Sequence, residues 1–298
     1  MKHEHFVVQS PATPAAQLIL LFHGVGDNPV AMGEIGSYFA KEFPQAQVVS
    51  IGGPEAFGNG AGRQWFSVQD VTEENRAARI AAVMPQFVAV VRHWQQLSGV
   101  GYAGTALVGF SQGAIMALEA LKAETRLAGR VVAFSGRFAQ LPEQAFGDSV
   151  VHLIHGEEDA VIAVQHAHAA AEALRAGGAD FTLDVEENVG HAINEGMMNA
   201  ALERLHYYVP QRYWDEALSG KRGELIAFRL KLRAPMSALM SFLFRPVVFV
   251  IPLGVVVAVR RYLRLVGQIA FHVDAAQFLD AADDHPHQNQ QDNPPVIS

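Results

Sequence analysis

Ser111 is the residue whose surroundings most favour chemistry. It lies at the centre of a Gly-x-Ser-x-Gly motif, Gly109–Gly113, which follows the short apolar run Ala106–Val108. Apolar residues at helical spacing come next, so the motif predicts a strand, a sharp turn and a helix, with the serine at the apex. Glycines two positions before and after the serine avoid side-chain collisions in such a strained turn. The alternative is that Ser111 merely caps a helix. The choice between the two interpretations depends on whether the chain also supplies an acid, a base and oxyanion donors.

An acid and a histidine follow the serine at the ends of later predicted strands. Glu157, Glu158 and Asp159 come after an apolar run, and His191 lies in a glycine-preceded loop further on. Groups at the carboxyl ends of parallel strands meet at one edge of a sheet. A histidine base can activate a serine hydroxyl, and an acid can orient the histidine. Asp159 is preferred because it directly precedes the next predicted helix, and the two glutamates stay open as alternatives.

Two backbone N–H groups are placed to stabilise a developing oxyanion. One belongs to Gln112, directly after the serine. The other is expected in the turn His23–Gly26 after the buried run Leu18–Phe22, where Val25 is the best candidate. A phosphate-binding loop is excluded for these glycines because no Gly-Lys-Ser/Thr follows them.

The elements that must position these groups alternate along the chain. Apolar runs predict strands at about 6–8, 18–22, 48–51, 106–108, 131–134, 150–154 and 181–185, and helical patterns lie at about 30–43, from 72 onward, from 115, 161–176 and 193–208. This alternation predicts an α/β fold, a mostly parallel sheet flanked by helices. Pro85 must either kink the second helix or mark the start of another one.

Composition narrows the classes of function. The chain has 298 residues, a net charge of −8 and no cysteine. The acidic balance argues against general nucleic-acid binding, and the missing cysteines exclude disulfides and a cysteine nucleophile. His166 and His168 are two residues apart and do not share a helix face, so they predict no metal pair. The first residues carry no apolar signal segment, so a cytoplasmic location is expected.

Three segments together resemble the carboxylesterase/phospholipase family of α/β-hydrolases, which includes the acyl-protein thioesterases. They are Leu21–Asp27, Gly109–Gly113 and Val189–His191, and Gly62–Phe66 adds a likeness to its small cytosolic bacterial esterases. The resemblance covers about residues 1–218.

The resemblance implies an α/β-hydrolase fold and a hydrolase that needs no cofactor or metal. It implies a triad of Ser111, Asp159 and His191 and oxyanion donors at Val25 and Gln112. It also implies a substrate-binding role for Trp65, as a lining of the acyl pocket. A core position for that tryptophan is the alternative. The expected substrate is a short-chain acyl ester, with a thioester or lysophospholipid as the alternative. A non-catalytic binding protein is disfavoured because no triad member is missing.

The chain changes character near Ser219. The predicted catalytic domain is 1–219, followed by a hydrophobic and basic extension, 220–282, and a polar tail, 283–298, that is expected to be disordered. Residues 234–259 carry a single charge, Arg245, and basic residues flank them. A membrane contact through 234–264 is therefore predicted, either spanning or lying on the surface, although Arg245 and two prolines disfavour a span. An extension without a function stays open.

Overall fold

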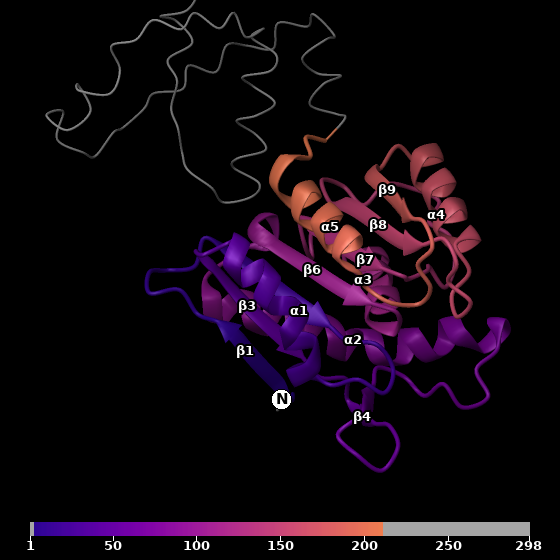
Figure 1. The fold of residues 1–298 in the computed structure, drawn as a ribbon, viewed down its shortest axis with the longest axis horizontal. Coiled ribbons are helices and arrows are strands. Elements are labelled where there is room, and N and C mark those ends of the chain that lie inside the picture. Colours follow the sequence, from indigo (N-terminus) through magenta and orange to yellow (C-terminus); the bar gives the residue numbers. More distant parts are fainter. Residues whose placement is uncertain (1–2, 211–298) are drawn as a thin grey trace, which may run out of the picture.

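The computed structural model describes residues 3–210, and these form a seven-stranded sheet with helices on both faces (Figure 1). The strands of this sheet are β1 (His5–Gln9), β2 (Gln17–Phe22), β3 (Ala46–Ile51), β6 (Thr105–Phe110), β7 (Arg130–Phe134), β8 (Val150–Gly156) and β9 (Asp180–Glu186). The helices are α1 (Pro29–Glu42), α2 (Glu73–Ser98), α3 (Gln112–Ala123), α4 (Gln165–Ala176) and α5 (Glu195–Tyr207). The predicted α/β architecture is confirmed.

The order of the strands across the sheet is β1-β3-β2-β6-β7-β8-β9. All neighbours are parallel except β1, which pairs antiparallel with β3 at one edge. Every residue of β2 is buried, as expected for a strand covered on both faces, whereas β9 at the other edge is mostly half-buried. The parallel strands therefore place all their carboxyl ends along one rim of the sheet.

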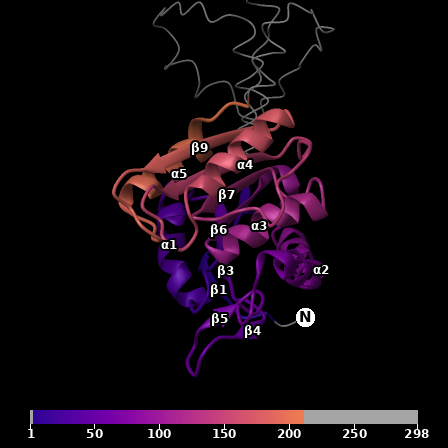
Figure 2. The same ribbon diagram turned by 90° about the vertical axis from the view of Figure 1, so that its right-hand side faces the viewer.

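The core consists of two apolar layers, one on each face of the sheet. Helices α2, α3 and α4 pack on one face, and α1 and α5 pack on the other (Figure 2). Helix α3 is buried along nearly its whole length because it lies between the sheet and α2. The helix that carries the candidate nucleophile at its start is thus fixed within the larger layer.

The structure excludes one of the two alternatives for Pro85 and corrects the predicted start of one helix. Pro85 does not start a new helix, because α2 runs without a break from Glu73 to Ser98. Pro85 lies on an exposed part of the helix, where the carbonyl that loses its N–H partner can be hydrated. Helix α4 begins at Gln165 rather than near Val161, because the N–H of Val161 is hydrogen-bonded to the side chain of Asp159 in a turn.

The structure contains a short second sheet that was not predicted from the sequence. Strands β4 (Glu55–Ala56) and β5 (Arg63–Gln64) pair antiparallel within the glycine-rich stretch that follows β3. Two-residue strands carry no readable periodicity, so only the folded chain reveals this ribbon. It matters for the site because β5 runs against the turn after β2.

Two sets of predictions fall on residues outside the described part. The domain boundary at 219, the extension 220–282, the tail 283–298 and the membrane contact through 234–264 all lie beyond residue 210. They stay predictions. Within residues 3–210, none of the helices has the length and apolar character needed to cross a membrane.

Candidate active site

Ser111 stands alone between β6 and α3 with a strained backbone. Its φ of 53° and ψ of −117° lie in a region that residues other than glycine rarely adopt. Its neighbours must be glycines because a Cβ at Gly109 would lie 2.4 Å from the nitrogen of Ala114, and one at Gly113 would lie 2.1 Å from the carbonyl oxygen of Phe22. The predicted turn is therefore present, and Ser111 lies at its apex between β6 and α3.

His191 reaches this hydroxyl from the loop between β9 and α5. Its Nε2 lies 2.8 Å from Ser111 Oγ, and its ring packs 5.0 Å from the ring of Phe110, centroid to centroid. The imidazole is partly exposed, so a ligand at the serine could also reach it. This contact joins residues 80 positions apart in the chain.

Asp159 completes the chain of hydrogen bonds. Its Oδ2 lies 2.7 Å from Nδ1 of His191, and its Oδ1 accepts hydrogen bonds from the N–H groups of Val161 and Ile162 at 2.9 and 2.8 Å. Burial of the carboxyl group opposes ionisation, but the hydrogen bond from His191 and those two backbone bonds outweigh it, so the pKa of Asp159 is lowered. The side chain is therefore held as a carboxylate.

The two competing acids are elsewhere. Glu157 and Glu158 are exposed, and their backbone N–H groups donate hydrogen bonds to the carbonyls of Glu186 and Val189. The preference for Asp159 thus agrees with the geometry, although the reason given for it does not. Asp159 does not directly precede a helix, because a turn separates it from α4.

His155 was not expected at the site and lies behind the acid. Its buried Nε2 is 2.7 Å from the carbonyl oxygen of Ile162 and 3.4 Å from Oδ2 of Asp159. Burial lowers the pKa of His155 more than the backbone hydrogen bond to Ile162 and the charge of Asp159 raise it. A neutral ring with its proton on Nε2 satisfies the carbonyl. Its position at a strand end, four residues before the acid, was the only signal in the sequence.

The predicted oxyanion donors lie on the same rim. Val25 is in the turn after β2, and Gln112 is the first residue of α3. Among residues 3–210, no group accepts a hydrogen bond from the N–H of Val25 or of Gln112. The N–H of Gln112 also lies at a helix N-terminus, where the macrodipole favours negative charge. Both donors are free to bind an anion.

Trp65 is placed differently from the expectation that it lines an acyl pocket. Its side chain is only 1% exposed and belongs to the core between the sheet and α2. Its ring packs edge-on against Phe22 and Phe87, and its Nε1 donates a hydrogen bond of 3.0 Å to the carbonyl oxygen of His23. The core alternative therefore describes its surroundings.

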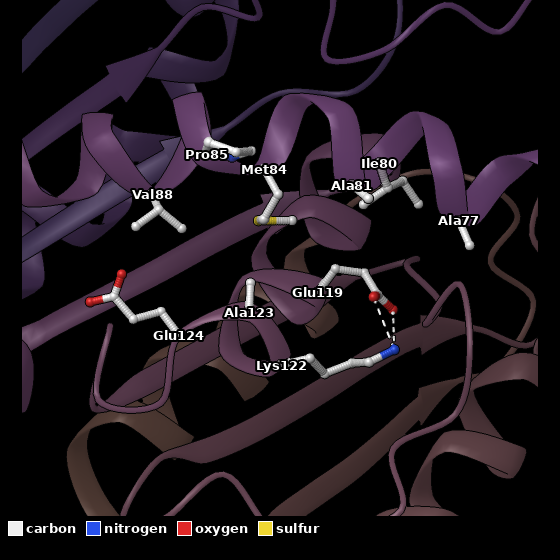
Figure 3. Close-up of a pocket in the computed structure, with 10 residues that line it drawn as sticks. All are labelled: Ala77, Ile80, Ala81, Met84, Pro85, Val88, Glu119, Lys122, Ala123 and Glu124. Carbon is white, nitrogen blue, oxygen red and sulfur yellow. Dashed lines mark hydrogen bonds and ion pairs between the residues drawn. The ribbon is translucent and has the colours of Figure 1, made fainter.

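A hollow of about 540 Å³ lies between α2 and α3, away from these groups (Figure 3). Its lining is largely aliphatic, including Ile80, Met84 and Val88, and its one drawn ion pair joins Lys122 to Glu119 at 3.0 Å. None of the predicted site residues lines it. The hollow is therefore separate from the predicted active site.

The fold and the rim together define an α/β-hydrolase. A serine on a strained turn, a histidine within hydrogen-bond reach of its hydroxyl and a buried carboxylate on the far ring nitrogen follow one another in the order serine, acid, histidine. Such an arrangement can remove the serine proton during attack on a carbonyl carbon.

Comparison with known proteins gives the family. A family model described as Phospholipase/Carboxylesterase matches residues 3–209, and the chain belongs to this family. Esterase YpfH of Escherichia coli (strain K12) is 63% identical over 220 residues, which are 74% of this chain and 95% of that protein. Acyl-protein thioesterase 1 of Kluyveromyces lactis is 25% identical over 178 residues, 53% of this chain and 76% of the relative.

A solved structure agrees with these relatives. The crystal structure of esterase PE8 superposes with a TM-score of 0.62 at 28% identity, over 69% of this chain and 98% of that one. The predicted family, fold and enzyme class are therefore confirmed: the chain is a hydrolase of the carboxylesterase class, and its substrate is a small-molecule ester.

Proposed function

We propose that this protein is a serine carboxylic-ester hydrolase in which Ser111, His191 and Asp159 form the catalytic triad. The observation that carries the proposal is the unbroken chain of hydrogen bonds from Ser111 Oγ through both ring nitrogens of His191 to Asp159 Oδ2, with distances of 2.8 and 2.7 Å. A non-catalytic binding protein of the same fold would have no need to maintain this chain.

In the first half of the reaction the acyl group moves to the enzyme. Ser111 Oγ attacks the carbonyl carbon of the ester while His191 Nε2 takes the hydroxyl proton. The carbon becomes tetrahedral and its oxygen becomes an oxyanion. When the carbon–oxygen bond to the leaving group breaks, the imidazolium returns the proton to that oxygen, and an alcohol departs. The acyl group is left as an ester of Ser111.

The second half of the reaction frees the enzyme. His191 Nε2 takes a proton from a water molecule, whose oxygen attacks the acyl carbon. The new tetrahedral intermediate collapses with cleavage of the bond to Ser111 Oγ, which receives the proton from His191, and the carboxylic acid leaves. Asp159 keeps the proton of His191 on Nδ1 and stabilises the imidazolium in both halves without being protonated itself.

The N–H groups of Val25 and Gln112 are proposed to bind the oxyanion in both tetrahedral intermediates. Support comes from their freedom from other partners within residues 3–210 and from their place on the rim that holds the triad. Preorganised donors of this kind are worth about 10²–10³ in kcat each.

The substrate is proposed to be an ester of a short acyl chain. The E. coli relative at 63% identity is named an esterase, which favours oxygen esters. A thioesterase activity is the second candidate, because a more distant relative is named Acyl-protein thioesterase 1. A panel of p-nitrophenyl esters and acyl thioesters of graded chain length separates the two by their kcat/KM values.

The catalytic domain is proposed to end near Ser219. The match to the family model over residues 3–209 and the 220-residue match to the E. coli relative support this boundary. A cytoplasmic location and a membrane contact through 234–264 are predictions from the sequence, and liposome flotation of the full chain tests the second.

A fluorophosphonate probe tests the nucleophile, because it forms a covalent bond with an activated serine. The wild type should be labelled in a one-to-one ratio, and Ser111→Ala should remove both labelling and about 10⁶-fold of kcat. Ser37→Ala is a matched control, since Ser37 is exposed on α1 with its hydroxyl bonded to the carbonyl of Glu34. Labelling that persists in Ser111→Ala would exclude Ser111 as the nucleophile.

A further inference from the structure

The two proposed oxyanion donors belong to segments that meet only in the folded chain. Val25 lies in the turn after β2, and Gln112 opens α3. An oxyanion hole works only if both N–H groups lie about 2.7–3.1 Å from one oxygen position. Strands β2 and β6 pair directly, with Phe22 opposite Gly109, so the two segments lie side by side. The exact distance between the two donors also depends on the residues that bond to both segments.

Strand β5 and the two residues after it contact the first of these segments. The N–H of Gly26 donates to the carbonyl of Arg63 at 2.9 Å, and the N–H of Arg63 donates to the carbonyl of Asp27 at 2.8 Å. A Cβ at Gly62 would lie 2.8 Å from the carbonyl oxygen of Gly26, so this close approach requires glycine there. The turn that carries Val25 is thus fixed against β5.

The same stretch holds the second segment through the side chain of Gln112. Its Oε1 accepts a hydrogen bond of 2.6 Å from the N–H of Trp65, and its Nε2 donates one of 2.7 Å to the carbonyl of Phe66. The side chain is buried, so both bonds are shielded from water. The first residue of α3 is therefore fixed to residues 65 and 66.

Trp65 is the residue that bonds to both sides. Its backbone N–H donates to Gln112, while its indole Nε1 donates to the carbonyl of His23, two residues before Val25. Phe22 and Phe87 pack against the ring at centroid distances of 5.5 and 5.3 Å. Trp65 thus bonds to the start of α3 through its backbone and to the turn after β2 through its side chain.

We infer that Trp65 is a positioning residue that sets the spacing of the oxyanion hole, rather than a wall of the acyl pocket. The inference rests on the proposed function, because it needs Val25 and Gln112 as the donors. The two roles differ in their consequences. A pocket wall governs which acyl chain is preferred and hence the ratio of rates between esters. A positioning residue governs stabilisation of the transition state, so its loss lowers kcat equally for esters of every chain length.

Trp65→Phe tests these roles because it keeps an aromatic ring in the core and removes the indole N–H, together with part of the ring volume. We expect kcat to fall about tenfold for all esters, with KM within about twofold, since a displaced donor loses part of the 10²–10³ that a whole donor supplies. A trifluoromethyl ketone, which forms a tetrahedral adduct with the serine, should bind about tenfold more weakly, in step with kcat/KM.

Gln112→Met is the second variant, and it serves if Trp65→Phe does not fold. It removes both side-chain hydrogen bonds and leaves the backbone N–H of residue 112 in place. It should show the same loss of kcat and of inhibitor affinity with KM nearly unchanged. The double variant should lose less than the product of the single losses, because both changes release the same spacing.

Phe87→Leu is the control for loss of core packing alone, because Phe87 contacts the ring of Trp65 without bonding either donor segment. It should lower the melting temperature and leave kcat and inhibitor affinity within about twofold. Three results would overturn the inference: wild-type kcat in a folded Trp65→Phe, or in Gln112→Met if Trp65→Phe does not fold; a change in acyl-chain preference without a uniform loss; or an equal loss in Phe87→Leu. Fluorophosphonate labelling keeps the two proposals apart. If the probe fails to label the wild type, Ser111 is not an activated nucleophile and the proposed function is refuted. If Trp65→Phe is labelled and keeps the wild-type kcat, only the positioning role of Trp65 is refuted.

Discussion

The nucleophile side of the site and the acid–base side are held by different means. On the nucleophile side, Ser111 and the free N–H groups of Val25 and Gln112 are placed by the backbone, in turns so tight that a Cβ at Gly113 would meet a carbonyl oxygen at 2.1 Å. On the acid–base side, His191 lies in a loop after the edge strand β9 and is held to Asp159 by a side-chain hydrogen bond of 2.7 Å.

This difference separates two kinds of vulnerability. Where the backbone sets the geometry, an added methyl group disturbs the fold, because close-packed atoms cannot move apart without strain. Where hydrogen bonds between side chains set it, a change of one atom can abolish the function and leave the fold intact. An added methyl group on the nucleophile side should therefore lower the free energy of unfolding. A change of one side-chain atom on the acid–base side should instead lower kcat.

Among the changes that keep Ser111 itself, the largest effect is expected on the acid–base side. Asp159→Asn should lower kcat by about 10⁴, because the amide no longer stabilises the imidazolium or keeps the ring proton on Nδ1. The melting temperature should change little in comparison. Glu157→Gln and Glu158→Gln are matched controls, since both side chains are exposed in the same loop. A comparable loss in Glu158→Gln would show that the wrong acid has been chosen.

The nucleophile side is tested by adding one methyl group. Gly113→Ala should destabilise the fold by about 3 kcal/mol, because the new Cβ has no room beside the carbonyl of Phe22. Urea denaturation measures the free energy of unfolding. Gly60→Ala serves as the control, since a Cβ there meets no atom within 4 Å. A Gly113→Ala protein with wild-type stability would remove the basis of the comparison.

Two buried histidines, His23 and His152, give the stability of the fold a pH dependence. Burial lowers the pKa of His23 and lowers that of His152 further, well below the ordinary 6.5. The unfolded chain then binds more protons than the folded one once the pH falls below about 6.5. Stability from these groups is complete above that pH and is lost as the pH falls toward their folded-state pKa values, by up to about 1.4 kcal/mol per pH unit for each proton.

Unfolding measured between pH 7.5 and 5.0 checks this expectation. His152→Asn should flatten the decline more than His23→Gln does, because the pKa of His152 is shifted further. Both substitutions keep a polar atom near the hydrogen bond that the histidine makes with Thr182 or with the N–H of Gly53. An unchanged slope in His152→Asn would mean that this histidine binds its proton in the folded protein.

The smallest effect is expected from removing the C-terminal part of the chain. Both sides of the site lie within residues 3–210, and the family model ends at 209. A chain of residues 1–220 should therefore fold and keep kcat/KM on a soluble short-chain ester within about twofold, as measured by steady-state kinetics. A shortened chain that fails to fold would place part of the core beyond residue 220 and refute the boundary near Ser219.

Much of the fold and most of the site could be predicted because their signals are local. A strand buried on both faces, such as β2, is a continuous apolar run in any sequence that forms it. The turn at Ser111 can be recognised from Gly109 and Gly113, because a side chain at either position would collide with the backbone. The order of serine, acid and histidine then follows from reading the ends of strands. These features depend on a few neighbouring residues, so the sequence alone determined them.

The tertiary structure decided what depends on contacts between distant segments. Only the folded chain brings Asp159 rather than Glu158 to Nδ1 of His191, because the choice depends on which side chain turns inward from the loop. The positions of His155 next to Asp159 and of Trp65 between the two donor segments could not be predicted from the sequence either. The role of a buried polar group depends on the partners that it contacts in the folded chain. Hydrogen bonds across 30 or more residues leave no periodicity in a sequence.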